Sequence, residues 1–359
     1  MPESKKLSNV GLLLIVIILL FLCSGVGRRL VKSICSNSII TIARELESQK
    51  LYRASNFFYE IALDYSSTTK WVDLHIAQNM RSLYWDKPLT TEKKVNLRKA
   101  LKHLDVEFAK RPNDPYIVQE YGFIYQQLEE FDKAIEYYKK ALEINPKMEY
   151  CFDKLAHIYS AIKLDYEKAL EYQDKKMEIH IDEGYYGDYY NKGYILAHLG
   201  RDKEAVECYE KYIEKNPHHV AGFVNIAISE VKIGRYDDAE KHVNEGLKYA
   251  PNFSYLLNTK VSILAHKHKF DEAINLANKI LEYEPYNYVS YFALARINQY
   301  KGDLEQAEKY YQMSKDKAQE YYNKYCKNHY DVGDFDGRCG NRYDFLQHFE
   351  ESKNEPVEF

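Results

Sequence analysis

The chain is 359 residues long, which exceeds one ordinary compact domain and suits either two domains or an elongated repeat array. Its 15 Gly and 9 Pro residues make up about half of the usual share, so collagen-like, linker-like and turn-rich all-β chains are disfavoured and long helices are favoured. The net charge of −4 gives no electrostatic reason to expect a nucleic-acid partner. The 6 cysteines include no C-x-x-C pair and are interpreted as free thiols.

The first predicted element is an apolar helix. Residues 7–27 carry no charge, with two lysines just before them and two arginines just after. A helix of about 21 residues rises about 31 Å, which matches the hydrocarbon thickness of a bilayer. We therefore expect residues 1–30 to form a single-pass membrane anchor or uncleaved signal. For the rest of the chain we favour a location on the cytoplasmic side of the membrane. The alternative is a cleaved secretory signal.

A 34-residue repeat follows this apolar segment. Alanines keep that spacing at Ala205, Ala239, Ala273 and Ala307. An internal repeat of this length indicates an array of small structural units. Upstream, the series continues through Ala169, Ala134 and Ala100 with a small insertion near KLDYEKAL and another in HIDEGYYGDYY. Ala54 is taken as its earliest member, after which a longer insertion around DKPLTTEK interrupts the period.

Each repeat predicts two helices joined by a short turn. In the repeat at 115–148, Val118, Tyr121 and Tyr125 follow the i, i+3, i+7 spacing of an apolar helical stripe. Glycines stand where a left-handed residue would end the first helix, and a proline closes most repeats because it cannot continue a helix. Small residues such as Gly122 and Ala134 are expected where two helix backbones approach closely.

These positions resemble the tetratricopeptide repeat. The repeat at 115–148 has a large apolar residue at repeat position 4, a small one at 8, alanine at 20 and 27, an aromatic at 24 and proline at 32. The resemblance implies an all-α, right-handed superhelical solenoid of stacked helix-turn-helix units, here preceded by one transmembrane helix. We predict degenerate helical pairs over 37–112, a regular array over 113–319, and a capping helix extension with an irregular tail over 320–359.

The resemblance also implies that the first helices line a concave, peptide-binding groove. Tyrosine gives a large contact area with a polar tip, and a carboxamide can pair with any peptide backbone, so both residue types suit capture of a protein segment. The residues predicted to line the groove are Tyr116, Gln119, Phe123, Tyr150, Asp153, His157, Tyr190, Asn191, Tyr194, Asn225, Ile228, Asn258, Phe292 and Arg296. Asn191 and Asn225 share repeat position 6, which is similar to the asparagine ladder in the repeats of O-linked N-acetylglucosamine transferases.

No nucleotide-binding, zinc-protease or serine-hydrolase motif occurs in the sequence. The one metal candidate is a zinc site built from Cys326, His329, Cys339 and His348, and the alternative is an irregular tail that packs over the last repeat. We therefore predict a membrane-tethered, non-catalytic scaffold that binds a protein or peptide partner and uses no cofactor, nucleic acid or small-molecule substrate. The alternatives are a secreted or periplasmic assembly factor with a cleaved signal and a regulatory subunit of an enzyme complex.

Overall fold

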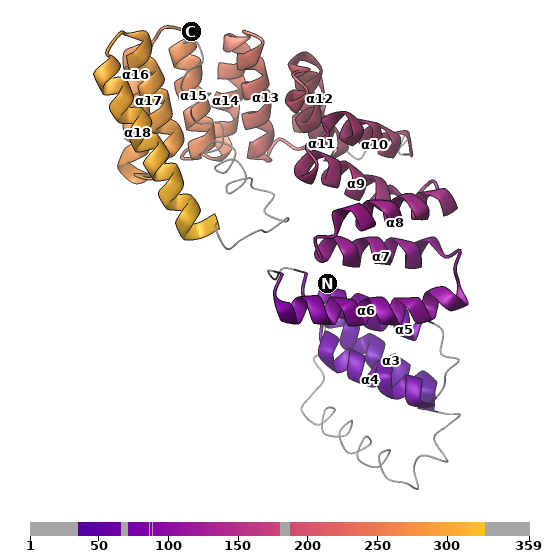
Figure 1. Cartoon of the computed structure of the whole chain (residues 1–359). Helices are drawn as coiled ribbons and strands as arrows, with labels where there is room; N and C mark the ends of the chain where they lie inside the picture. The colour runs from indigo at the N-terminus through magenta and orange to yellow at the C-terminus, as the bar shows by residue number, and fades with distance from the viewer. Residues whose placement is uncertain (1–34, 66–70, 86, 88, 180–186, 327–359) are drawn as a thin grey trace. The chain divides into compact units, whose positions relative to one another are not determined.

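All regular structure in the described part of the chain is helical. A computed structural model describes residues 35–65, 71–85, 87, 89–179 and 187–326, and it contains no strand in these ranges (Figure 1). The chain divides into two compact units, an N-terminal unit of residues 1–146 and a C-terminal unit of residues 147–359. The prediction of consecutive helical hairpins is confirmed for the described residues, whereas the handedness of their winding stays a prediction.

The described residues of the N-terminal unit form three helical hairpins. They pair α3 (Cys35–Ser48) with α4 (Tyr52–Tyr65), α5 (Val72–Ser82) with α6 (Thr91–Lys110), and α7 (Pro115–Gln127) with α8 (Phe131–Ile144). Local sequence fixes the helix starts: the Asp114 side chain accepts a hydrogen bond from the Tyr116 amide, and Pro115 occupies the first turn, where it displaces no helical bond. Thr90 caps α6 in the same way.

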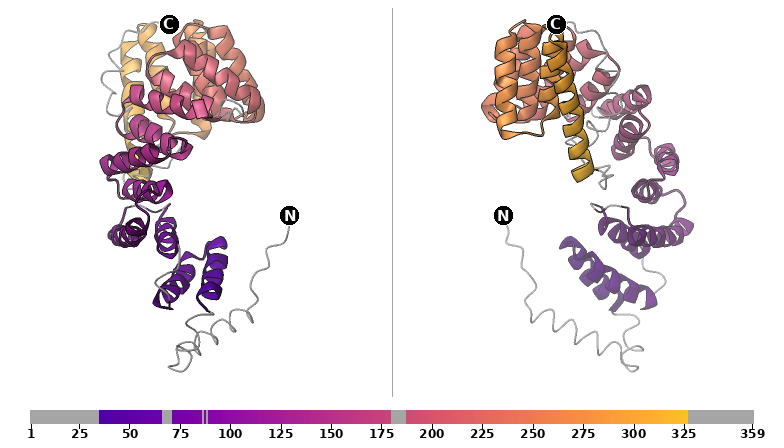
Figure 2. Two further views of the ribbon diagram at one scale, coloured as in Figure 1. Left: turned by 90° about the vertical axis from the view of Figure 1, so that its right-hand side faces the viewer. Right: turned by 60° about the vertical axis from the view of Figure 1, so that its left-hand side comes forward.

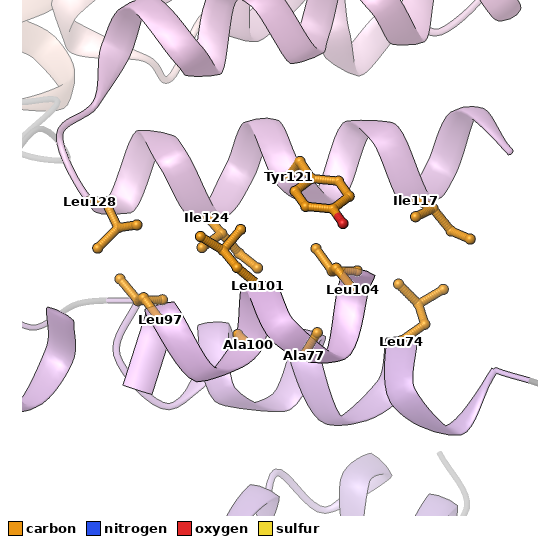
Figure 3. Packing of buried hydrophobic residues seen from close by; sticks show 10 residues of the cluster. All are labelled: Leu74, Ala77, Leu97, Ala100, Leu101, Leu104, Ile117, Tyr121, Ile124 and Leu128. Atoms are coloured by element: carbon orange, nitrogen blue, oxygen red, sulfur yellow. The ribbon is translucent and has the colours of Figure 1, made fainter. Parts of the chain in front are cut away.

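Leucines and isoleucines from three helices form the core between the second and third hairpins. Figure 3 shows Leu97 of α6 opposite Leu128 of α7, and Leu74 of α5 opposite Ile117 of α7. Leu97, Leu104, Ile117 and Ile124 are fully buried. Each such side chain contributes about 1.5–3 kcal/mol on removal from water, so this shared core joins one hairpin to the next.

Five hairpins lie in the part of the C-terminal unit that the structure describes, and Figure 2 shows them from two directions. They pair α9 (Glu149–His157) with α10 (Tyr166–Ile179), α11 (Gly187–His198) with α12 (Asp202–Lys215), α13 (Val220–Lys232) with α14 (Tyr236–Tyr249), α15 (Ser254–His266) with α16 (Phe270–Tyr283), and α17 (Tyr288–Tyr300) with α18 (Leu304–Tyr321). The last helix continues as a π-helical turn over Tyr322–Cys326.

Small residues at repeat position 8 allow the two helices of a hairpin to approach each other. A Cβ atom added to Gly122 would lie 2.6 Å from Cε1 of Tyr138 at position 24, and one added to Gly193 would lie 2.8 Å from Cε1 of Tyr209. The tyrosine rings therefore occupy the space that a side chain at position 8 would need. Close packing of this kind explains why the small residues recur with the period.

In seven of the eight hairpins in the described residues, the turn contains a left-handed residue five positions before the position-20 residue; the exception is the hairpin of α5 and α6. Gly200, Gly234 and Gly302 have φ of +71°, +76° and +83°, as the sequence predicts. At the equivalent positions of other hairpins, residues with side chains adopt the same conformation: Lys50, Glu129, Leu164 and His268 have φ between 51° and 60°. Because L-residues are strained there, the turn geometry is imposed by helix packing as well as by glycine.

The first hairpin differs from the prediction by one residue. Ala54 is exposed, and Ser55 occupies the buried position expected for it. The Ser55 hydroxyl donates to the Ala43 carbonyl oxygen at 2.8 Å, so the polar side chain is satisfied at the helix contact. Tyr59 and Ala62 follow at the spacing of positions 24 and 27 and are fully buried.

One predicted insertion is visible as a π-helical segment. Residues Ile158–Ile162 continue α9 as a π-helix just before KLDYEKAL, which accommodates the extra residue without breaking the hairpin. The second insertion lies in residues 180–186, outside the described residues, as do the apolar segment 7–27 and the tail from residue 327. Within the described ranges, no helix has both the length and the apolar character needed to cross a bilayer.

Candidate functional site

The fourteen predicted groove residues are distributed over both compact units. Tyr116, Gln119 and Phe123 lie on α7 of the N-terminal unit, and the other eleven lie on first helices of the C-terminal unit. Tyr116 is 62% exposed and Gln119 is half-buried. Phe123 is buried, and the Arg81 guanidinium lies 4.8 Å from the centre of its ring.

A buried ion pair holds Arg81 over Phe123. Arg81 Nε donates to Glu120 Oε1 at 2.5 Å, and the Glu120 side chain is only 3% exposed. Burial raises the pKa of the Glu120 carboxyl, although the neighbouring guanidinium opposes that shift. The pair connects α5 to α7 and leaves Tyr116 as the exposed aromatic among the three predicted residues of α7.

On α9, the predicted residues form a charged cluster. Asp153 Oδ1 accepts from Lys176 Nζ at 2.9 Å, and Lys154 Nζ lies 3.5 Å from Asp153 Oδ2 and 4.7 Å from the centre of the exposed Tyr150 ring. Although burial acts in the opposite direction, Lys176 and Lys154 hold the pKa of Asp153 below its ordinary value. Burial, and then the charge of Lys154, lower the pKa of His157. Asp153 therefore already has a cationic partner inside the chain.

Lys176 connects this cluster to the next hairpin. Its Nζ atom lies 2.8 Å from Asp188 Oδ1 on α11, and the side chains of Lys176 and Asp188 are 9% and 3% exposed. Lys176 stands at repeat position 27, where the resemblance implies alanine. Burial lowers the pKa of a lysine, but Asp188 and Asp153 reverse that effect, so the pKa of Lys176 is raised and the ammonium stays charged.

An exposed apolar pair lies on α11 and α13. Tyr194 and Ile228, at repeat position 9 of neighbouring hairpins, are both 41% exposed. Asn225 Nδ2 donates to Tyr190 Oη at 3.0 Å, which links α13 to α11 beside them. We call Tyr190, Tyr194, Asn225 and Ile228 the first-helix surface. Asn191, the other predicted ladder residue, is half-buried on α11.

Asn258 joins α15 to the start of α17. Its Nδ2 atom donates to Asn287 Oδ1 at 3.1 Å, and its Oδ1 atom accepts from Ser290 Oγ at 2.7 Å. Asn287 also caps α17 by accepting from the Ser290 amide. The carboxamide predicted to contact a partner is therefore engaged in a contact between two hairpins.

The last two predicted residues lie on α17 and are half-buried. Phe292 packs edge-on against Tyr311, with ring centres 5.4 Å apart. Arg296 lies near His266, whose pKa is lowered first by burial and then by the charges of His268 and Arg296. This end of the C-terminal unit therefore concentrates basic side chains.

The sequence analysis missed a hollow on the opposite helices. A cleft of about 740 Å³ lies between α12 and α14, the second helices of their hairpins, and none of the fourteen predicted residues lines it. The cleft and the predicted groove thus lie on different faces of the hairpins, and the groove stays a prediction. The available signal was the spacing of Glu207, Glu210 and Glu214, which places three carboxylates along one side of α12.

The described residues contain no group of three or more His, Cys, Asp or Glu side chains placed to hold a metal ion. Of the predicted zinc ligands, Cys326 ends the last π-helical turn, and His329, Cys339 and His348 lie outside the described residues. The zinc site stays a prediction.

Comparisons with known proteins confirm tetratricopeptide repeats in the chain. Models of this repeat match residues 122–148, 188–219 and 288–312. A TPR repeat-containing protein of Methanocaldococcus jannaschii is 26% identical over 219 residues, which cover 58% of this chain and 38% of the relative. The peroxisomal targeting signal receptor of Kluyveromyces lactis is 24% identical over 183 residues, covering 51% and 26%. The chain thus spans well under half the length of these curated relatives.

A solved structure supports the fold. The C-terminal part of a TPR repeat-containing protein from Cytophaga hutchinsonii superposes with a TM-score of 0.56 at 14% identity, covering 71% of this chain and 99% of that one. At this identity the likeness concerns the fold alone. With the repeat matches and the helical hairpins, it establishes an all-helical tetratricopeptide-repeat solenoid in the described residues.

Proposed function

We propose that this chain is a non-catalytic scaffold that binds an extended segment of a partner protein along the first helices of its repeats. We also propose that residues 7–27 tether it to a membrane. The observation that carries the binding proposal is the pair formed by Tyr194 and Ile228, two apolar side chains exposed at the same repeat position of neighbouring helices. The relationship to a peroxisomal targeting signal receptor supports a role in recognising protein segments.

The contacts around this pair favour binding because they restrict the side chains in advance. Tyr194 packs against His198 with ring centres 4.4 Å apart, and His198 stacks on Tyr166 at 4.6 Å. The hydrogen bond between Asn225 and Tyr190 restricts the two polar side chains beside the pair. A surface whose rotamers are already restricted loses less entropy on binding, and tyrosine adds a hydrogen-bonding tip to its apolar area.

The non-catalytic part of the proposal rests on the state of the candidate nucleophiles. Cys151 is fully buried, and burial raises the pKa of its thiol to about 12. Burial raises the pKa of the Cys208 thiol as well. A thiol with a raised pKa and no access to solvent is a poor nucleophile at neutral pH, so these two cysteines are assigned to packing.

Photo-crosslinking tests the binding site. A benzophenone amino acid would replace Tyr194 or Ile228 in the full chain, and a third chain would carry it at Tyr283 of α16, which is 45% exposed but lies on a second helix. We expect both first-helix positions to give an adduct with the same protein and the Tyr283 position to give none. Equal adduct yields from all three positions would refute a site on the first helices.

Carbonate extraction tests the tether separately. We expect the full chain to stay with the membrane pellet and the Ile17→Arg/Leu20→Arg variant to move to the supernatant, because a charge at the bilayer centre is costly. Mass spectrometry of the mature N-terminus distinguishes an anchor from a cleaved signal. Release of the wild-type chain by carbonate would overturn the tether and leave the binding proposal untouched.

A further inference from the structure

The cleft between α12 and α14 is a concave surface lined mainly by second helices, and it shares no residue with the first-helix surface. It is lined by Glu207, Glu210, Lys211, Ile213, Glu214, Pro217, Phe223, Lys241, His242, Glu245 and Tyr249. All of these residues lie in the C-terminal unit. Its volume of about 740 Å³ falls in the range of sites that accept a sizeable ligand group.

The walls of the cleft carry an excess of negative charge. Four glutamates line it against two lysines. Two of the glutamates have lysine partners outside the lining, since Glu214 lies 3.4 Å from Lys215 Nζ and Glu245 lies 2.5 Å from Lys248 Nζ, so the excess comes from Glu207 and Glu210. The ammonium of Lys211 lies 5.1 Å from the centre of the Tyr189 ring on α11, so this cation already has an aromatic partner. Among the described residues, Glu207 and Glu210 have no ion pair within 4.0 Å. Both are therefore available to an incoming cation.

A fifth carboxylate lies behind the wall. Glu230 on α13 is fully buried, and its Oε2 atom lies 2.8 Å from Nδ1 of His242, which lines the cleft. The other oxygen, Oε1, makes no hydrogen bond within the described ranges and lies 3.9 Å from Arg235 Nη2. Glu230 thus connects α13 to the wall of the cleft through His242.

The floor of the cleft is apolar and offers an aromatic ring. Tyr249 is 41% exposed, and its ring stacks on the buried Phe223 with centres 6.2 Å apart. His218 contacts the same ring edge-on at 4.9 Å. The ring is thus held in place with one part accessible, which is the arrangement that a cation needs to lie against an aromatic face.

We propose that this cleft is a second docking site, which receives an arginine or lysine side chain from a basic segment of a partner protein. The carboxylates of Glu207, Glu210 and Glu214 would surround the cation, and the stem of its side chain would cover Tyr249. The site goes beyond the proposed function, because it lies on second helices and allows the scaffold to hold two partners at once. An acidic segment or a nucleic acid is repelled by the same charges.

Fluorescence anisotropy with labelled peptides tests the proposal on the full chain. The probe is the peptide GSRLRFRSG, and the comparison peptide is GSELEFESG, in which glutamate replaces arginine. We expect the arginine peptide to bind with an affinity that falls as salt rises, and the glutamate peptide not to bind. Absence of binding by the arginine peptide, or equal binding by both, would overturn the site.

Matched variants locate the binding. Glu207→Gln/Glu214→Gln should weaken the arginine peptide about fivefold, since it removes two carboxylates from the cleft. The control Glu136→Gln/Glu143→Gln removes carboxylates from the same two repeat positions of α8 and should change nothing. Likewise Tyr249→Ala should weaken binding and Tyr283→Ala, at the same repeat position of α16, should not. Equal effects in either matched pair would contradict the assignment.

A further variant separates this proposal from the first one. Tyr194→Ala/Ile228→Ala removes the exposed apolar pair of the first-helix surface and should leave binding of the arginine peptide unchanged. Loss of peptide binding in this variant would place the peptide on the first helices. That result would refute the second site while supporting the proposed function.

Discussion

Replacing Lys176 with methionine should strongly destabilise the C-terminal unit around α9, α10 and α11. The ammonium lies 2.9 Å from Asp153 and 2.8 Å from Asp188, and its removal would leave the Asp188 carboxylate, 3% exposed, without a cationic partner. Breaking a buried pair from one side costs about 3–5 kcal/mol. Asp153 is 33% exposed and stays partly solvated, so we expect a loss near the lower limit, about 3 kcal/mol. Methionine keeps most of the lysine stem, which limits any cavity contribution.

A second substitution tests whether the unpaired charge is the cause. In Lys176→Met/Asp188→Asn, the buried carboxylate becomes a neutral carboxamide, so we expect at least half of the lost stability to return. The two substitutions should therefore be coupled by about 1.5 kcal/mol, within the range measured for residues in contact. Lys175→Met is the matched control: that side chain is 47% exposed and pairs with Glu171 on the surface, so its loss should cost under about 0.5 kcal/mol.

Urea unfolding followed by far-ultraviolet circular dichroism measures the overall change. Hydrogen exchange with mass spectrometry locates it, because repeat arrays can open in parts. In Lys176→Met we expect peptides from α9 to α11 to exchange faster than in the wild-type chain. Peptides from α17 and α18 should exchange at the wild-type rate. If Lys176→Met costs no more than Lys175→Met, or if the double variant is less stable than the single one, then desolvation of the ion pair is not what holds these helices together.

Three further predictions concern turns, thiols and pH. Because φ is positive at both sites, Gly234→Ala should lower the free energy of unfolding by about 1 kcal/mol. For the same reason, Leu164→Gly should raise it by about 0.5 kcal/mol. The midpoints of urea unfolding measure both changes. Cys151 should resist iodoacetamide in the native chain and react after unfolding, as peptide mass spectrometry would show. The pKa values of His157 and His266 are lowered by burial and neighbouring cations, so the unfolded chain binds protons more readily. Stability present above about pH 6.5 should therefore be lost as the pH falls further, less steeply in His157→Gln/His266→Gln.

The hairpins could be predicted because their spacing follows from a contact between backbones. Gly122 faces the ring of Tyr138 at a distance that excludes any side chain, and Gly193 faces Tyr209 in the same way. A residue type that the helix contact requires recurs in the sequence at a fixed spacing. The turns are harder to predict from the sequence. Leu164 and His268 adopt the left-handed conformation typical of glycine, although neither residue type favours it.

The register of the first hairpin shows the limit of matching residue types. Alanine at position 54 fits the period by identity, but Ser55 is the residue at the helix contact. Serine is almost as small as alanine, and its hydroxyl finds the Ala43 carbonyl. A pattern defined by alanine alone therefore predicts the wrong contact residue, Ala54, because the adjacent serine is of similar size and its hydroxyl is hydrogen-bonded.

Exposure within the candidate site could not be predicted from repeat position. Phe123, Tyr194 and Ile228 all stand at position 9, yet Phe123 is 6% exposed and the other two are 41% exposed. The difference comes from Arg81, which lies over Phe123 because Glu120 holds it there. Arg81 belongs to the preceding hairpin, so its contact with Phe123 depends on packing between hairpins and not on either local sequence.

The departures from the repeat identify where folding and binding can be separated. Lys176 replaces the alanine of position 27, and Glu230 stands at position 11, which Tyr125 occupies in the repeat at 115–148. Both are buried: Lys176 pairs with Asp188 of α11, and Glu230 contacts His242 of α14. A buried ion pair is no better for stability than well-packed apolar residues, so neither substitution is explained by the repeat itself. Lys176 lies under Asp153 of the predicted groove, and Glu230 lies behind the acidic cleft. Replacing Lys176 or Glu230, each together with its partner, by neutral side chains of similar volume should preserve the hairpins while changing the charge beneath each surface. Comparing partner binding by these variants would show which of the two surfaces a partner contacts.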